Sequence, residues 1–481
     1  MTQRAPHPLT KLTRRMLPFA DAASRDLPIG QLLRLSLFQV SVGLASVMLL
    51  GTLNRVMIVE LSVPAMIVAI MIALPVLIAP FRAFIGFRSD TYRSAIGWKR
   101  VPFIWFGSLW QMGGLAVMPF ALLVLSGDQT VGPSWDGEVL AALAFLMTGL
   151  GLHMTQTAGL ALASDRASEE TRPRVVALLY VMYLLGMGLS ALLIGWLLRD
   201  FTNLTLIRVV QGAALAGLLL NLVALWKQEH MSPMTKVQRS APRPSFAKTW
   251  SAFMAEGTSA RLIFVVFLGT MAFNMQDVLL EPYGGEILGL AVGQTTWLTA
   301  AWAFGALIGL AYAARRLNAG ISSYRLMSNS IFVGLLAFPA VIVSAPIGST
   351  LLFFAGAFLI GLGSGLFAVS TLIAAMMLGE TEHTSHGLAL GAWGASQATS
   401  AGLAIALGGT LRDWINTLAM RGDLGETLAT PATGYSFVYH LEIAVLIVTL
   451  AILVPLVRMA QRTQSKSDHG NSGIKLADFP M

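Results

Sequence analysis

Long apolar runs alternate with short polar segments along most of this chain. A run of roughly 20 apolar residues is long enough to cross about 30 Å of hydrocarbon as an α-helix. Runs of about that length recur through the whole sequence. The pattern predicts twelve membrane-spanning helices, at residues 34–59, 64–87, 101–125, 138–163, 174–198, 204–226, 260–281, 291–314, 325–345, 349–378, 387–411 and 437–458.

An internal duplication divides these spans into two sets of six. The segments 149–200 and 361–413 both open with Gly-Leu-Gly and both close with Leu-Arg-Asp. Self-similarity over such a long period indicates two copies of one helical block, as in transporter scaffolds built from repeats around a central interface. The expected organisation is a tail at 1–33, a six-helix bundle at 34–226, a polar linker at 227–258, a second six-helix bundle at 259–459 and a tail at 460–481.

Composition places the chain in a bilayer. Hydrophobic residues make up 55% of it, charged residues 12%, and the mean hydropathy is +0.70, so a water-soluble core could not hide the apolar surface. Cysteine is absent, which excludes disulfides and thiolate metal sites. The first 30 residues hold charges and prolines rather than a cleavable signal, so the first span is expected to insert and stay.

Positive charge sets the expected orientation. Lys and Arg concentrate in the tails, in the linker and in alternate loops, which predicts that both termini are cytoplasmic. The net charge of +8 is therefore mostly an orientation signal and gives no support for a nucleic-acid partner. A short amphipathic helix on the membrane lipids is predicted where apolar and basic residues interleave at helical spacing, at Leu9, Lys11, Leu12, Arg14, Arg15, Met16 and Leu17.

The loop between spans two and three, GFRSDTYRSAIGWKR at 86–100, resembles the signature loop of the major facilitator superfamily. In that pattern a glycine lets two helices approach, and an acid and several bases form a charge cluster at the cytoplasmic mouth. Thr91 departs from the pattern, which has an arginine directly after the acid. The pattern therefore does not identify which of Arg93, Lys99 and Arg100 forms the latch. The residues expected to form this gate loop are Gly86, Asp90, Arg93, Gly97, Lys99 and Arg100.

Few ionisable groups lie at membrane depth, where each one costs several kcal/mol unless it is paired or hydrated. Arg55 lies near the outer end of the first span, and Asp277 and Glu281 lie at comparable depth in the seventh. Because an unpaired arginine at that level would be costly, we expect an ion pair between Arg55 and these acids across the two halves. The chain shows no nucleophile–base constellation, phosphate loop or metal-ligand spacing, so neither an enzyme nor a metal site is expected.

Four segments carry a more specific resemblance. The runs LLGTLNRVMIVELSVP at 49–64, GLGLHMTQTAGLALASD at 149–165 and FNMQDVLLEPYGGEILGL at 273–290, together with the 86–100 loop, resemble the PucC/LhaA family. This family is the bacteriochlorophyll-delivery branch of the major facilitator superfamily in photosynthetic bacteria. The similarity covers about residues 30–460.

The resemblance implies an all-α integral membrane protein with the major facilitator fold, in the inner (intracytoplasmic) membrane of a photosynthetic bacterium. It also implies a factor that assembles light-harvesting antenna complexes, by binding or delivering bacteriochlorophyll or by chaperoning oligomerisation. The implied partners are the antenna α and β polypeptides, with the core (LH1) ring favoured as client. The reaction centre–LH1 complex, pigment-synthesis enzymes and membrane lipids are further expected partners.

A weakly charged interior suits an oily cargo such as a chlorin, whose site needs an apolar surface and one axial ligand for magnesium. His153 lies well inside span four, one turn from Gln156, and is the predicted pigment ligand. His440 enters span twelve near Glu442. The role of His153 competes with that of a buried, hydrogen-bonded histidine.

Two other functions stay open. In a proton-coupled carrier of an apolar or amphipathic solute, Asp277 or Glu281 would titrate as the halves rock. A non-transporting scaffold would instead bind antenna helices through its lipid-facing flank. The sequence leaves open whether pigment is transported, held or handled by the client polypeptides alone.

Overall fold

The structure, a computed structural model, describes residues 23, 27–77, 97–125, 136–167, 171–229, 257–378 and 386–468. Within these ranges ten helices are long and apolar enough to cross a membrane. With the shorter helix at 65–77 and the helix at 386–420, each of the twelve predicted spans coincides with one helical passage. The N-terminal tail and most of the predicted linker lie outside the described residues.

The N-terminal half has six passages, and the first of them changes its helical type on the way. Residues Ile29–Ser46 form the α-helix α2, and the π-helical turns η2 and η3 continue it to Glu60. The elements are α2 (Ile29–Ser46), η2 (Val47–Leu53), η3 (Val56–Glu60), α3 (Ala65–Leu77), α5 (Val101–Leu125), α6 (Asp136–Arg166), α7 (Arg172–Leu197) and α8 (Asn203–Leu225).

The C-terminal half repeats this plan, and here too the first passage is irregular. A short 3-10 turn, η4, separates α11 from α12. The elements are α11 (Gly257–Asn274), η4 (Met275–Val278), α12 (Leu280–Glu286), α13 (Val292–Asn318), α14 (Ser323–Ile347), α15 (Thr350–Leu378), α16 (His386–Met420), η5 (Glu426–Leu428) and α17 (Ala432–Asp468).

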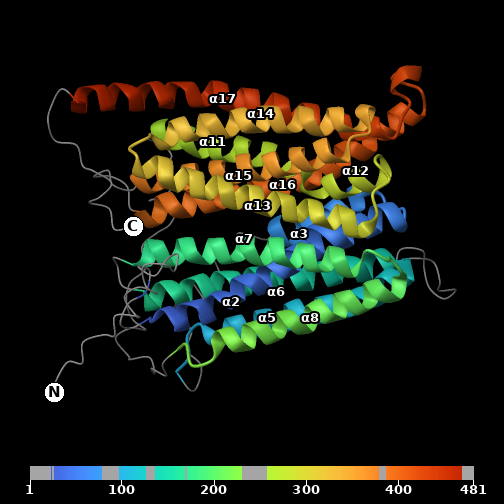
Figure 1. Cartoon of the computed structure of the whole chain (residues 1–481), viewed down its shortest axis with the longest axis horizontal. Helices are drawn as coiled ribbons and strands as arrows, with labels where there is room; N and C mark the ends of the chain where they lie inside the picture. Colours follow the sequence, from blue (N-terminus) through green and yellow to red (C-terminus); the bar gives the residue numbers. More distant parts are fainter. Residues whose placement is uncertain are drawn as a thin grey trace.

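The two halves lie side by side with their helices roughly parallel to a common axis (Figure 1). Within the N-terminal half α5 packs on α6 and α2 packs on α7 and α8, while in the C-terminal half α15 packs on α13 and α14. Two helix pairs, α3 with α16 and α7 with α13, form the largest contacts between the halves. These pairs position the site described below.

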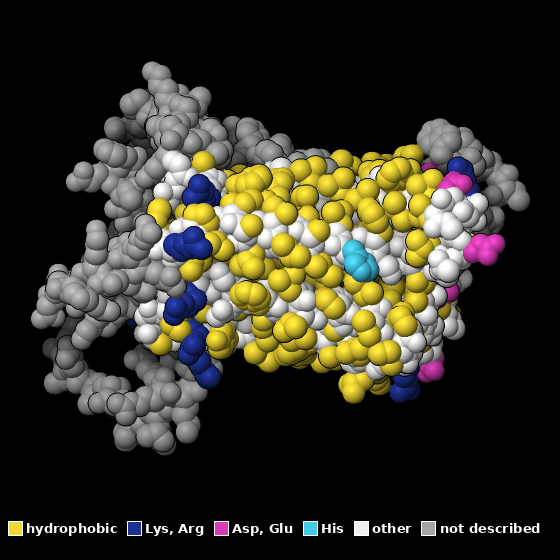
Figure 2. All heavy atoms as spheres, turned by 90° about the horizontal axis from the view of Figure 1, so that it is seen from above, with side chains coloured by type: hydrophobic (Ala, Val, Ile, Leu, Met, Phe, Trp, Pro, Cys, Tyr) yellow, Lys and Arg dark blue, Asp and Glu magenta, His cyan; other side chains and the backbone are white. Residues whose placement is uncertain are grey.

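The surface carries the pattern of a protein that spans a bilayer. Figure 2 shows an apolar belt; Lys and Arg gather at one end, and Asp and Glu lie at the other together with further Lys or Arg side chains. Large apolar side chains are exposed on many helices, such as Leu336 at 69% exposure and Leu351 at 82%, and an apolar surface of this extent is unusual in a soluble monomer. The protein is therefore a multi-pass membrane protein. We call the end at which α2 begins and α17 ends the terminal face, and the opposite end the distal face.

Glycine lets neighbouring helices touch backbone to backbone. A Cβ added at Gly305 of α13 would collide with the carbonyl oxygen of Phe358 in α15, and one at Gly361 of α15 would collide with the carbonyl oxygen of Trp302. Small residues at such contacts are the usual means of close packing in membranes, where lipid is as apolar as the helix surface.

Gly305→Ala is therefore expected to destabilise the protein by about 1–3 kcal/mol, because the new methyl group has to separate α13 from α15. Unfolding of the detergent-purified protein measures this change. Gly212→Ala in α8 is the matched control, because a Cβ there meets open space. Equal losses from the two substitutions would contradict the close-packing argument.

Candidate functional site

The first passage of the N-terminal half meets the C-terminal half near the distal face through buried polar groups. The Asn54 amide donates to the carbonyl oxygen of Val278 at 3.0 Å, and Arg55 Nη2 donates to that of Leu290 at 3.1 Å. The hydroxyls of Thr52 and Thr296 lie 3.3 Å apart. We call this set of contacts between the halves the distal seam. Each polar group of the seam gains a partner that hydrocarbon could not supply.

The first passage of each half leaves the regular α-helix where the seam forms. The first passage of the N-terminal half is π-helical over η2 and η3. The first passage of the C-terminal half is interrupted at η4, between α11 and α12. Single π-helical turns and interrupted spans occur frequently at functional positions, because they turn side chains and backbone groups inward. Apolar periodicity does not reveal either irregularity.

A buried carboxylate lies between the two irregular segments. Glu281 is 3% exposed, and the hydroxyl of Thr299 donates to it. The carboxylate packs directly against Gly51, where an added Cβ would collide with it. Glycine at position 51 therefore leaves the carboxylate in place, and a larger residue there would require Glu281 to move.

The predicted charge pair between Arg55 and the acids of span seven is met only in part among these described residues: Arg55 interacts electrostatically with Glu281 but makes no direct ion pair with it. Arg55 pairs instead with Glu60 of its own passage, while Asp277 accepts a hydrogen bond from its neighbour Gln276. The reason is local: a π-helical turn joins residues five apart, as in the bond from Leu61 N to Val56 O. That spacing brings Glu60 onto the side of the helix occupied by Arg55, although Arg55 still crosses the seam to Leu290.

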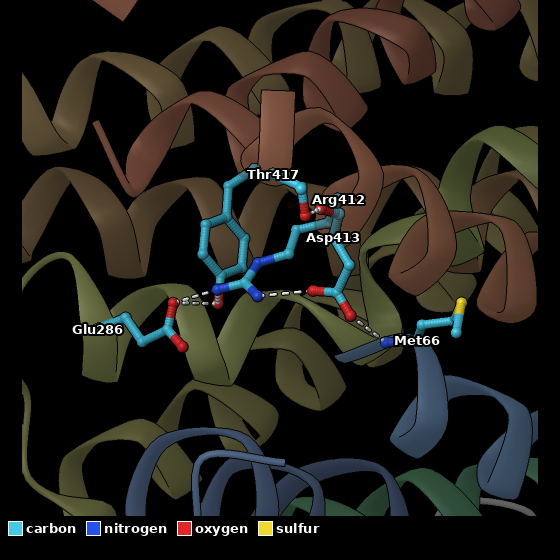
Figure 3. Close-up of polar contacts among 6 residues, drawn as sticks. Met66, Glu286, Arg412, Asp413 and Thr417 are labelled. Atoms are coloured by element: carbon cyan, nitrogen blue, oxygen red, sulfur yellow. Dashed lines mark hydrogen bonds and ion pairs between the residues drawn. The ribbon is translucent and has the colours of Figure 1, made fainter. Parts of the chain in front are cut away.

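A second polar cluster closes the seam at the distal face (Figure 3). Arg412 of α16 donates to Glu286 of α12, to the Tyr435 hydroxyl at 3.0 Å and to Asp413 at 2.7 Å. Its guanidinium also lies over the Tyr435 ring, 4.4 Å from the centroid. We call this group the distal clamp. Its planar guanidinium holds its donors in fixed directions and stacks on the ring at the same time, a combination that the ammonium of a lysine does not provide.

The distal clamp reaches the other half through Asp413. Its free carboxylate oxygen accepts the backbone N–H of Met66 at 2.6 Å, at the start of α3 (Figure 3). A carboxylate at a helix N-terminus satisfies an unpaired donor and interacts favourably with the helix dipole. In the sequence Arg412 and Asp413 stand out only as the end of the repeat, and the pattern predicts no role for them.

The duplicated counterpart of the clamp is different. Arg199 and Asp200, which end the first repeat, form an ion pair with each other at 3.2 Å and are 64% and 89% exposed, and Arg199 also lies over the ring of Trp196. The side chain of Arg412 is 9% exposed. The two Leu-Arg-Asp motifs diverge because α7 ends at Leu197 whereas α16 continues to Met420.

At the terminal face a further charged cluster joins three elements of the N-terminal half. Arg100 Nε lies 3.0 Å and Lys99 Nζ 3.7 Å from Asp165 at the end of α6. The Glu229 carboxylate accepts the backbone N–H groups that begin α5, those of Lys99, Arg100 and Val101. These bonds fasten α5, α6 and the end of α8 to one another.

The remaining residues of the predicted gate loop are placed only in part. Gly97 adopts a φ of +86°, a conformation that glycine reaches without strain. Gly86, Asp90 and Arg93 lie outside the described residues. A latching role for the loop between the two halves therefore stays a prediction.

The predicted pigment residues lie together on one helix. His153 and Gln156 are both half-buried in α6, one turn apart. Their role toward pigment stays a prediction. Within the described ranges, no group of three His, Asp or Glu side chains is arranged to hold a metal ion.

Comparison with solved structures defines the class. A bacterial homologue of the human lysosomal transporter Spinster superposes with a TM-score of 0.64 at 15% identity, over 91% of this chain and 97% of that one. The POT family transporter PepTSo gives 0.63 at 12% identity, over 89% and 98%. The protein thus has the major facilitator fold, an all-α membrane architecture of two six-helix halves.

Sequence comparison narrows the class to a family. A family model described as PUCC protein matches residues 52–461. Protein PucC of Rhodovulum sulfidophilum is 53% identical over 83% of this chain and 88% of its own, and the chain belongs to the PucC family. An uncharacterized protein in the puhA-bchM intergenic region of Rhodobacter capsulatus is 62% identical over 96% and 97%. A more distant relative, named the bacteriochlorophyll synthase 44.5 kDa chain of Rhodobacter capsulatus, is 27% identical over 87% and 93%.

Arg412→Met is expected to reduce the free energy of unfolding by about 3–5 kcal/mol, because it leaves Glu286 and Asp413 without their counter-charge. Arg199→Met removes the equivalent residue of the first repeat and should cost about 0–1 kcal/mol, since its ion pair is exposed. Denaturation in mixed micelles measures both changes. A similar cost at the two positions would show that burial of the clamp does not stabilise the fold.

Proposed function

We propose that this protein is an assembly factor for bacterial light-harvesting antenna complexes, with the core (LH1) ring as its favoured client. Membership of the PucC family carries the proposal, because resemblance to that family implies this role. Similarity to a protein named as a chain of bacteriochlorophyll synthase favours the same pigment as cargo. The proposed location is the intracytoplasmic membrane of a photosynthetic bacterium, with the terminal face toward the cytoplasm.

The apolar belt favours recognition from the lipid side. Bacteriochlorophyll and the antenna helices are both dissolved in the bilayer, so they reach this protein by lateral diffusion. The polar groups of the distal seam are used in bonds between the halves, whereas the outer surface offers large apolar side chains such as Leu336 and Leu351. We propose that pigment and antenna polypeptides are held at this surface while they combine, and that the halves need not rock.

One observation favours a second function, a proton-coupled transporter. Glu442 of α17 is fully buried. The backbone of Gln276 lies close to its carboxylate, but no side chain in the described structure donates a hydrogen bond to it. Asp277 is close enough to interact with it electrostatically. Buried acids without counter-charges are typical of proton relays in membrane proteins. Substrate-dependent proton flux in liposomes, abolished by Glu442→Gln, would establish this alternative.

Purification from a pigmented membrane tests the proposed function directly. The tagged protein is isolated in mild detergent, its absorption spectrum is recorded, and the polypeptides bound to it are identified. We expect bound bacteriochlorophyll and antenna α or β polypeptides. A colourless preparation without antenna polypeptides would contradict the proposal.

A disulfide across the distal seam distinguishes transfer of pigment at the outer surface from transport by alternating access. Because the chain has no cysteine, Thr52→Cys with Thr296→Cys introduces one pair, at hydroxyl positions 3.3 Å apart. We expect antenna assembly in cells to continue when this pair is oxidised, because surface hand-over needs no rocking. The same variant with reduced thiols is the control. Loss of assembly on oxidation, reversed by a membrane-permeant reductant, would favour alternating access instead.

A further inference from the structure

A histidine lies on the outer surface of the last helix, within the apolar belt. His440 is exposed on α17, while the adjacent Tyr439 is fully buried. It lies eight residues from the start of the helix at Ala432, about 12 Å along the axis at 1.5 Å per residue. Its outward neighbours on α17, Phe437 and Ile447, are exposed apolar side chains within the candidate membrane span Ala432–Met459. The position is thus inside the hydrocarbon layer and faces lipid.

One ring nitrogen of this histidine is already committed. His440 Nδ1 lies 2.6 Å from the carbonyl oxygen of Ser436, one turn earlier. A carbonyl oxygen accepts, so Nδ1 carries the hydrogen, and in the neutral imidazole Nε2 keeps its lone pair. Such a bond from the second nitrogen to a backbone carbonyl is the usual way in which a metal-binding histidine is oriented. Within the described residues no protein group bonds Nε2.

Hydrocarbon offers Nε2 no partner, so a polar nitrogen at this place is costly unless a ligand occupies it. Glu442, the nearest acid in the sequence, is not a partner for Nε2, because Glu442 is fully buried whereas His440 faces outward. The ligand has to be a Lewis acid that is itself soluble in lipid. A magnesium chlorin meets both conditions, since its metal accepts one axial donor and its macrocycle is apolar.

The surface around His440 suits a broad planar ligand. Ser436 and Ala444, one turn before and one turn after it, are small residues, and Ala444 is exposed. Phe437, at 40% exposure, and Ile447, at 54%, continue the same outward face along α17. Aromatic and branched side chains supply apolar area for a macrocycle and its hydrocarbon tail.

We propose that His440 is the axial ligand of a bacteriochlorophyll held on the lipid-facing side of α17, through Nε2. This inference rests on the proposed function and specifies where the pigment is bound. It moves the pigment from His153, the residue that the sequence favours, to the outer face of the C-terminal half. The side chain of His153 is half-buried in α6 and engaged in other contacts.

The test compares three proteins purified from the same pigmented membrane: the unchanged chain, His440→Leu and His153→Leu. We expect His440→Leu to lose bound bacteriochlorophyll by about tenfold or more, as removal of a metal ligand does, while His153→Leu keeps it. Resonance Raman spectra of the bound pigment should show a five-coordinate magnesium that is altered in His440→Gln. Melting temperature and gel filtration establish that each variant is folded, and a lipid-facing substitution should leave both unchanged.

The outcomes separate the two proposals. Equal pigment content in the unchanged chain and in folded His440→Leu would overturn the assignment of His440 and leave the proposed function standing. Loss of pigment in His153→Leu alone would place the ligand in α6 and overturn it as well. Absence of pigment from all three proteins would overturn both the assignment and the pigment-binding function.

Discussion

The buried polar contact between the first passage of the N-terminal half and the C-terminal half is the constraint on which the rest of the structure depends. A carboxylate at 3% exposure is tolerated at Glu281 because Thr299 donates to it and Gly51 leaves room for it. Asn54 and Arg55 then cross to backbone carbonyls of the other half. In hydrocarbon these groups have no alternative partners, so separating the halves here would expose several of them at once.

The duplication explains the plan of the molecule, and its divergence explains how the plan became asymmetric. Both repeats end in Leu-Arg-Asp, but only the second places its arginine in a buried cluster and its aspartate on the N-terminus of α3. The first leaves the same two residues exposed. A single helix length accounts for the difference, since α16 continues beyond the motif and α7 does not. The distal face is thereby tied together by the C-terminal half.

Apolar runs predict the spans well, because the thickness of the bilayer sets how many consecutive apolar residues a spanning helix needs. The run at 101–125, for example, coincides with α5. Features that depend on tertiary contact were not predictable in the same way. The ion pair of Arg55 with Glu60 was not predicted, because a regular helix was assumed where the chain is π-helical. The outward direction of His440 was also hidden, since a single apolar span does not reveal which of its sides meets lipid.

These features support one account, in which the halves form a joined scaffold and the oily cargo approaches from the membrane. The most direct test is a cryo-electron microscopy structure of the protein purified from pigmented membranes. The account predicts planar density against the outer side of α17, with its centre next to His440 Nε2. Density for a solute in a water-filled cavity between the two halves, with the surface of α17 bare, would contradict it.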